Sequence, residues 1–168
     1  MVSIPTEFNL SDYYLFDRLT EGLESRTALR SGDRQWTYGE VAKRTLRTVS
    51  VLQTLGLRSE DRVYIVLPDI APFAWSFFGV LKAGGVVAMG NPLSKADDLS
   101  YVVDYIRPRV VITTASVGQK LETYWGDRSN RPTLLLTPDA ETFDDPEAPL
   151  DDPRCLATHI ENAAPDPI

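Results

Sequence analysis

Four short apolar runs, which recur about every 23 residues, constrain most strongly how this chain can fold. They are Arg62–Leu67, Val86–Met89, Arg109–Thr113 and Thr133–Leu136, and a segment with helical spacing separates each run from the next. Short apolar runs bounded by turn residues are typical of strands that are buried between helices. Strands that alternate with helices form a parallel sheet, because each parallel pair needs a crossover connection. The sequence therefore predicts an α/β fold with a mostly parallel sheet covered by helices on both faces.

The stretch from Phe77 to Pro92 shows the repeating unit most clearly. Its first part carries apolar side chains at three- and four-residue spacing, which is one face of a helix. Gly84 and Gly85 follow, and they allow the left-handed conformation and the chain reversal that residues with a Cβ resist. The run Val86–Met89 then predicts a short strand that is sealed on both faces, and the proline ends that strand.

The first third of the chain precedes this alternation. Tyr13 to Leu23 has the spacing of an amphipathic helix, and Thr27–Arg30 with Arg34–Trp36 predicts a short hairpin. Thr37 and Glu40 form a capping-box pattern, in which each side chain accepts a hydrogen bond from the backbone N–H of the other residue. We therefore expect the longest helix to begin directly after the hairpin.

The composition changes after Pro138. Residues 139–153 are rich in Asp, Glu and Pro and poor in apolar side chains, as in solvated surface segments. The sequence therefore predicts an α/β subdomain over residues 1–138. Residues 139–168 are predicted to form an acidic, proline-rich linker that leads toward a further part of a longer protein.

Charge and cysteine content narrow the classes of partner. The formal net charge is −7 and the basic residues are scattered, which argues against nucleic acid as a partner. Cys155 is the only cysteine, so an intrachain disulfide is excluded and a reducing compartment is favoured. The chain has neither a signal-peptide pattern at its start nor an apolar run long enough to cross a bilayer. We expect a cytoplasmic protein that does not bind membranes.

Residue patterns for catalysis are weak. The loops after the four predicted strands match neither the dinucleotide-binding nor the P-loop glycine pattern. His159, the only histidine, has no cysteine or second histidine at metal-ligand spacing, so a packing or surface role is favoured over a metal site. Cys155 lies one helical turn before His159 and could act as a nucleophile only if a base or a positive field activated it. The residues alone predict a scaffold with no catalytic residue and no metal site.

Three stretches taken together resemble one family. They are Trp36–Val41, Asp61–Asp69, and Gly79–Val87 followed by Asn91–Leu93. In this order and spacing the chain resembles the N-terminal portion of the adenylate-forming acyl- and aryl-CoA ligases. It is most similar to the benzoate and aminobenzoate CoA ligases. The resemblance implies part of the N-terminal domain of the adenylate-forming enzyme fold.

The resemblance also implies a reaction for the complete enzyme. An aromatic acid, ATP and coenzyme A give aryl-CoA, AMP and pyrophosphate through an acyl-adenylate, and Mg²⁺ neutralises phosphate charge. In that family the phosphate loop, the acid pocket and the C-terminal lysine lie beyond the region matched here. We therefore expect residues 1–168 to be inactive alone and to need the missing C-terminal part of the ligase as a partner, with a homodimer left open.

One residue is a candidate ligand contact by resemblance. In the family, the loop after the Asn-Pro pair approaches the coenzyme A entrance, and relatives often place an arginine after the proline. This chain has Leu93 there, and Lys95 could replace the arginine as a contact to a coenzyme A phosphate.

A second class of function stays open at this point. The chain could be an interaction module that keeps the ligase scaffold without its chemistry and docks onto another subunit through an open sheet edge.

Overall fold

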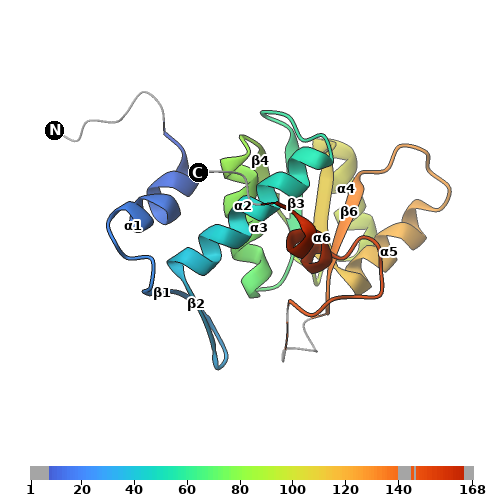
Figure 1. Cartoon of the computed structure of the whole chain (residues 1–168). Coiled ribbons are helices and arrows are strands. Elements are labelled where there is room, and N and C mark those ends of the chain that lie inside the picture. The colour runs from blue at the N-terminus through green and yellow to red at the C-terminus, as the bar shows by residue number, and fades with distance from the viewer. Residues whose placement is uncertain (1–7, 140–144, 146, 165–168) are drawn as a thin grey trace.

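A parallel sheet organises the part of the chain that the computed structural model describes, residues 8–139, 145 and 147–164 (Figure 1). Its strands are β3 (Arg62–Val66), β4 (Val86–Met89), β5 (Val110–Thr114) and β6 (Thr133–Thr137). They lie in the order β4-β3-β5-β6, and every neighbouring pair is parallel. In register, Val63 of the central strand β3 pairs with Val87 on one side and with Val110 on the other. The predicted α/β fold with a parallel sheet is confirmed.

Helices cover both faces of this sheet. They are α2 (Tyr38–Thr54), α3 (Ala71–Lys82), α4 (Ala96–Ile106), α5 (Ala115–Trp125) and α6 (Leu156–Asn162). Alternate residues of β3 point to opposite faces, as the strand period of two requires. Val63 and Ile65 join a core cluster with α2, α3 and α6, whereas Tyr64 and Val66 join a second cluster with α4 and α5. Helix α2 packs against both α3 and α6 and lies across the front of the molecule in Figure 1.

Strand β4 corrects one prediction. It lies at the edge of the described sheet and pairs with β3 alone. The side chains of Val86 and Met89 are 47% and 62% exposed, so the prediction that this strand is sealed on both faces is wrong. Its apolar run resembles that of a buried strand, but the order of strands in the sheet leaves one flank without a neighbour.

The glycine pair before β4 has the expected backbone role. Gly84 has φ = +76°, the left-handed conformation that ends α3. Gly85 needs its missing side chain for another reason. A Cβ there would lie 3.2 Å from the carbonyl oxygens of both Asp61 and Val80. The turn from α3 into β4 therefore requires glycine at both positions, first for conformation and then for space.

The N-terminal part agrees with the prediction in its hairpin and differs in its helix. Strands β1 (Thr27–Ser31) and β2 (Arg34–Thr37) form the antiparallel hairpin. The expected helix from Tyr13 to Leu23 is shorter, with a π-helical turn η1 (Asp12–Phe16) and a short α1 (Asp17–Thr20). The capping box at the start of α2 is confirmed. The Glu40 N–H donates to Thr37 Oγ1 at 3.2 Å, and the Thr37 N–H donates to Glu40 Oε2 at 2.7 Å.

The described part of residues 139–168 packs against this core. Leu156 and Ile160 of α6 are buried in the cluster with α2 and α3, and Cys155 forms a parallel bridge with Leu136 of β6. The Ser50 hydroxyl of α2 donates to the Ala164 carbonyl at 2.7 Å. Residues 140–144, 146 and 165–168 lie outside the described residues. The division into a subdomain and a linker therefore stays a prediction.

Of the helices in the described ranges, none combines the length and the apolar content that a membrane span requires.

Candidate functional site

Lys95 lies where the loop after β4 enters α4. It is the N-cap residue of that helix, and its carbonyl accepts a hydrogen bond from the Leu99 N–H at 3.1 Å. Its side chain is exposed, and the neighbouring Leu93 side chain is 90% exposed. An exposed ammonium at the carboxyl end of a parallel strand has room for a phosphate, since ligands bind at this edge of open α/β sheets. The contact from Lys95 to coenzyme A stays a prediction.

Cys155 and His159 make separate backbone contacts instead of a pair. The Cys155 thiol is buried and accepts a hydrogen bond from the Leu150 N–H at 3.2 Å, while His159 Nε2 lies 2.9 Å from the Pro153 carbonyl. Burial raises the pKa of the Cys155 thiol, but hydrogen bonds outweigh it, from the Leu150 N–H and the side chain of Thr158 above all, and the pKa is lowered overall. Because the thiol is closed to solvent, this arrangement does not present a nucleophile.

Metal-binding side chains do not gather in the described ranges. Within residues 8–139, 145 and 147–164, no group of three or more His, Cys, Asp and Glu side chains is placed to hold a metal ion.

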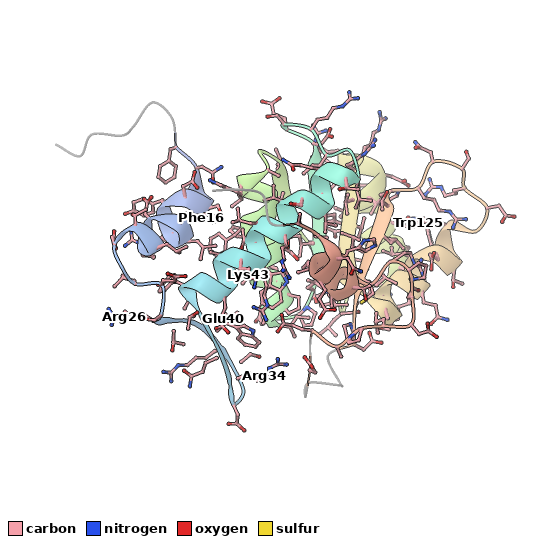
Figure 2. All side chains as sticks on the ribbon, in the orientation of Figure 1. Phe16, Arg26, Arg34, Glu40, Lys43 and Trp125 are labelled. Atoms are coloured by element: carbon pink, nitrogen blue, oxygen red, sulfur yellow. The ribbon has the colours of Figure 1, made fainter. Side chains whose placement is uncertain are left out.

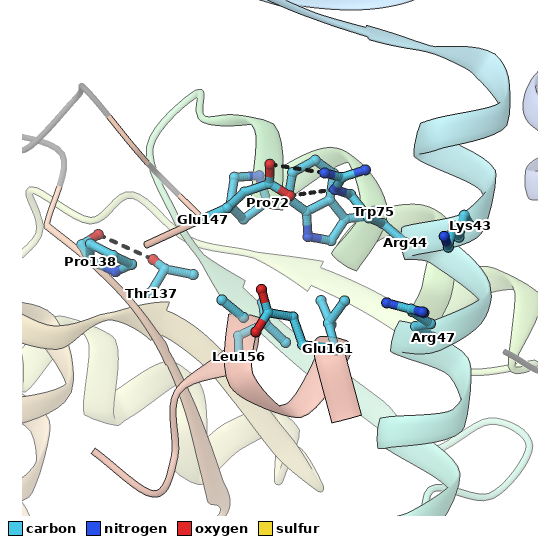
Figure 3. Close-up of a pocket in the computed structure, with 12 residues that line it drawn as sticks. Lys43, Arg44, Arg47, Pro72, Trp75, Thr137, Pro138, Glu147, Leu156 and Glu161 are labelled. Atoms are coloured by element: carbon cyan, nitrogen blue, oxygen red, sulfur yellow. Dashed lines mark hydrogen bonds and ion pairs between the residues drawn. The ribbon is translucent and has the colours of Figure 1, made fainter. Parts of the chain in front are cut away.

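A cavity of about 200 Å³ lies between α2, α3, α6 and the carboxyl end of β6 (Figure 3). One wall is basic and comes from α2, with Lys43, Arg44 and Arg47. Figure 2 labels Lys43 on that helix. The opposite walls are formed by the following apolar and polar residues: Pro72, Trp75, Thr137, Pro138, Leu156, Ala157 and Ile160. Two acidic residues, Glu147 and Glu161, complete the lining.

The Glu147 carboxylate lies at one end of this cavity, in contact with four nitrogen atoms of three residues. Arg44 donates to it from two nitrogens, Nε to Oε1 and Nη2 to Oε2, the latter at 3.1 Å. The indole N–H of Trp36 donates to Oε2 at 3.2 Å, and Arg34 Nη2 forms an ion pair with the same oxygen at 3.5 Å. A two-nitrogen contact between guanidinium and carboxylate is the strongest common form of charge-assisted hydrogen bond. The acidic segment is thereby tied to both the hairpin and α2.

Two cations of the cavity lack such a partner. Among the described residues, neither Lys43 nor Arg47 makes an ion pair or a side-chain hydrogen bond, and the Nε of Arg47 is buried without an acceptor. Buried donors are nearly always paired in folded proteins.

The sequence reasoning missed this cavity. Lys43, Arg44 and Arg47 are spaced so that they share one side of a helix, which is a readable signal. Their partners Trp75 and Glu147 come from distant parts of the chain, and no local pattern connects them to α2.

Comparison with known proteins identifies the family. The family model described as "AMP-binding enzyme" matches residues 16–167. A 4-hydroxybenzoate–CoA/benzoate–CoA ligase of Rhodopseudomonas palustris is 28% identical over 159 residues, which are 95% of this chain and 29% of that protein. A long-chain-fatty-acid–CoA ligase of Bacillus subtilis is 32% identical over 113 residues, which are 66% of this chain and 20% of that protein.

Solved structures agree with this match. A benzoate CoA ligase from Burkholderia xenovorans LB400 superposes with a TM-score of 0.75 at 28% identity, over 95% of this chain and 29% of that chain. The anthranilate CoA ligase AuaEII, solved with anthranoyl-AMP, has a TM-score of 0.83 at 23% identity, over 97% of this chain and 30% of that chain, and supports the fold alone. This chain spans less than a third of the length of these relatives. It belongs to the AMP-binding enzyme family of adenylate-forming acyl- and aryl-CoA ligases.

Proposed function

We propose that this chain is the N-terminal scaffold of an adenylate-forming aryl-CoA ligase. The complete enzyme would convert an aromatic acid, ATP and coenzyme A into aryl-CoA, AMP and pyrophosphate. The observation that carries the aromatic preference is that benzoate–CoA ligases recur among the relatives. That of Rhodopseudomonas palustris matches 95% of this chain at 28% identity, and that of Thauera aromatica matches 67% at 31% identity.

The described residues offer a contact for coenzyme A but no cradle for the phosphates of ATP. Lys95 offers one exposed cation at the carboxyl end of β4, which suits a coenzyme A phosphate. Within the described ranges, no glycine-rich turn leaves a strand of the sheet, so no cradle for the ATP phosphates can be assigned to them. We therefore propose that the rest of the ligase binds ATP and Mg²⁺ and that residues 1–168 are inactive alone.

A second function is favoured by the edge strand β4. Its Met89 side chain is exposed, and so is that of Leu93 in the loop that follows the strand. An edge strand has unpaired backbone groups that another strand can join. This edge suits a non-catalytic interaction module that docks onto another ligase subunit.

Reconstitution tests both functions. The chain is assayed for thioester formation from benzoate or aminobenzoate, ATP and coenzyme A. It is tested alone and together with the part of the Rhodopseudomonas palustris ligase that follows the matched region. We expect thioester only in the mixture. Activity of the chain alone would refute the scaffold role, and a stable complex without thioester would support the interaction module instead.

A pair of variants locates the docking face in the same assay. Met89→Lys places a charge on the open flank of β4 and should weaken both association and thioester formation. Tyr124→Lys places the same charge at another exposed apolar side chain, on α5, and should leave both unchanged. Equal effects of the two variants would show that the complementary part does not dock at β4.

A further inference from the structure

Two arginines and two tryptophans form a fixed basic surface where the hairpin meets α2 and α3. The guanidinium carbon of Arg34 lies 5.3 Å from the ring centroid of Trp36, and that of Arg44 lies 5.4 Å from the ring centroid of Trp75. The two indole rings meet edge to face with centroids 6.2 Å apart, and both tryptophans are buried. Because each guanidinium lies over a buried aromatic ring, contacts within the surface itself hold it in place. We call these four residues the Arg–Trp cluster.

Two carboxylates of the acidic segment occupy the Arg–Trp cluster. Asp145 Oδ1 accepts a hydrogen bond from Arg34 Nη1 at 2.5 Å, and the Glu147 carboxylate accepts from Arg44 and Trp36 (Figure 3). The Glu147 N–H also donates to Asp145 Oδ1 at 3.1 Å, which fixes the two acidic residues relative to each other. The cluster therefore binds two carboxylates that lie two residues apart in one chain.

The acidic segment is held on the Arg–Trp cluster by charge. Of the described residues 145 and 147–150, none is buried, and every hydrogen bond or ion pair from them to the hairpin or α2 involves Asp145 or Glu147. The side chains of Asp145 and Arg34 are 51% and 40% exposed. Ion pairs with this exposure contribute little to stability, because water competes for both partners. A second segment with the same pair of carboxylates can therefore replace the chain's own.

We propose that the Arg–Trp cluster is a docking site for an acidic segment of a partner protein, and that Asp145 and Glu147 close this site in the chain alone. The partner's segment carries two carboxylates two residues apart, as these two residues do. The chain's own segment competes with it at a high effective concentration, because it is tethered. Neither ATP nor coenzyme A takes part, so the proposal stands apart from the ligase function.

Binding is measured by fluorescence anisotropy on the complete chain, with a labelled peptide of residues 145–150 as the probe. Asp145→Ala and Glu147→Ala together open the cluster, and we expect this chain to bind the peptide with a Kd of about 0.1 mM. The unchanged chain should bind it at least about tenfold more weakly, because its own segment competes at a millimolar effective concentration. The indole N–H signal of Trp36 in NMR spectra of the opened chain should shift on peptide addition, which reports the location.

Two control peptides test the recognition of paired carboxylates. The first carries Asn and Gln in place of the acidic residues and should not bind, because the charge-assisted hydrogen bonds are lost. The second moves the glutamate to the last position, which keeps the charge but changes the spacing. It should bind about tenfold more weakly, because only one carboxylate can reach its donors at a time.

Variants of the opened chain assign the donors. Arg44→Gln should abolish peptide binding, because Arg44 supplies two of the donors to the glutamate. Arg26→Gln makes the same change at an exposed arginine outside the cluster and should leave binding unchanged. If Arg44→Gln does not fold, Arg34→Gln, at a side chain that is 40% exposed, takes its place. If the opened chain does not fold, Glu147→Ala alone replaces it.

Several results would overturn the proposal. They are the absence of peptide binding to the opened chain at several millimolar, equal binding to the unchanged chain, equal binding of either control peptide, or a folded Arg44→Gln variant that binds as the opened chain does. The first result would mean that the two carboxylates serve only to fasten the acidic segment. None of these outcomes bears on thioester formation in the reconstituted ligase.

Discussion

Replacement of Leu156 by alanine tests whether the segment after residue 139 is part of the folded core. Leu156 is the first residue of α6 and is 1% exposed, within the cluster that includes β3, α2 and α3. The substitution removes three carbon atoms, worth about 0.8 kcal/mol each in transfer free energy, or about 2.4 kcal/mol. The cavity left behind adds to this, and measured Leu→Ala costs in cores run from about 2.7 to 5 kcal/mol. We expect a loss of about 3 kcal/mol in the free energy of unfolding.

Urea denaturation followed by circular dichroism measures this loss. With a slope of about 2 kcal/mol per molar urea, the midpoint should fall by about 1.5 M. Asn162→Ala is the control, because Asn162 is exposed at the end of the same helix and its change should stay within about 0.5 kcal/mol. A Leu156→Ala midpoint that differs from the unchanged chain by no more than the control would refute the reasoning. It would mean that α6 is detached in solution and that residues 139–168 behave as the solvated linker predicted from composition.

Two further predictions concern acid stability and the turn before β4. A side-chain hydrogen bond from Arg154 lowers the pKa of Asp152 from 3.8 to about 2. The ionised Asp152 therefore stabilises the folded protein fully above pH 3.8, and this stabilisation is lost as the pH falls toward 2. Asp152→Asn should remove about 1 kcal/mol from the change in unfolding free energy between pH 5 and pH 2, after allowance for solvent screening. Urea midpoints over this pH range measure the change. A profile equal to that of the unchanged chain would contradict the role given to the Asp152–Arg154 pair. Gly84→Ala should cost about 1 kcal/mol in thermal or urea unfolding, because φ = +76° disfavours a Cβ. Gly84→Asn, which tolerates that conformation better, should cost less, and equal costs would point to crowding instead.

Much of the secondary structure was predictable because its causes are local. Periodicity in the apolar residues located the strands of the sheet and helices α2 to α5, and the capping box at Thr37 and Glu40 marked the start of α2 correctly, whereas α6 was not predicted in the segment expected to be a linker. The exposed edge of β4 was not predictable, because the strand order depends on contacts between distant segments. An apolar run such as Val86–Met89 has the same sequence pattern whether its second flank is covered by the same chain or left open.

The candidate cavity was beyond local reasoning for the same physical reason. Composition indicated that the acidic segment is solvated, yet its Glu147 carboxylate is held by Arg44, 103 residues earlier, and by Trp36, 111 residues earlier. A carboxylate in an acidic, proline-rich stretch carries no sign of which cation it will meet. The prediction for Lys95 came from resemblance, and it awaits a binding measurement with coenzyme A.

The dependence of α2 on late residues has a consequence for synthesis. The side of α2 that faces the cavity gains its last contacts from Glu147 and from Leu156 and Ile160 of α6, which come late in the chain. A ribosome that adds about 5–20 residues per second needs on the order of 5–20 s to translate the stretch between α2 and these partners. During that interval the nascent helix presents both apolar side chains and an unneutralised Arg44 to its surroundings. Chaperones that recognise basic and apolar segments together would therefore meet this protein at α2 before its fold is complete.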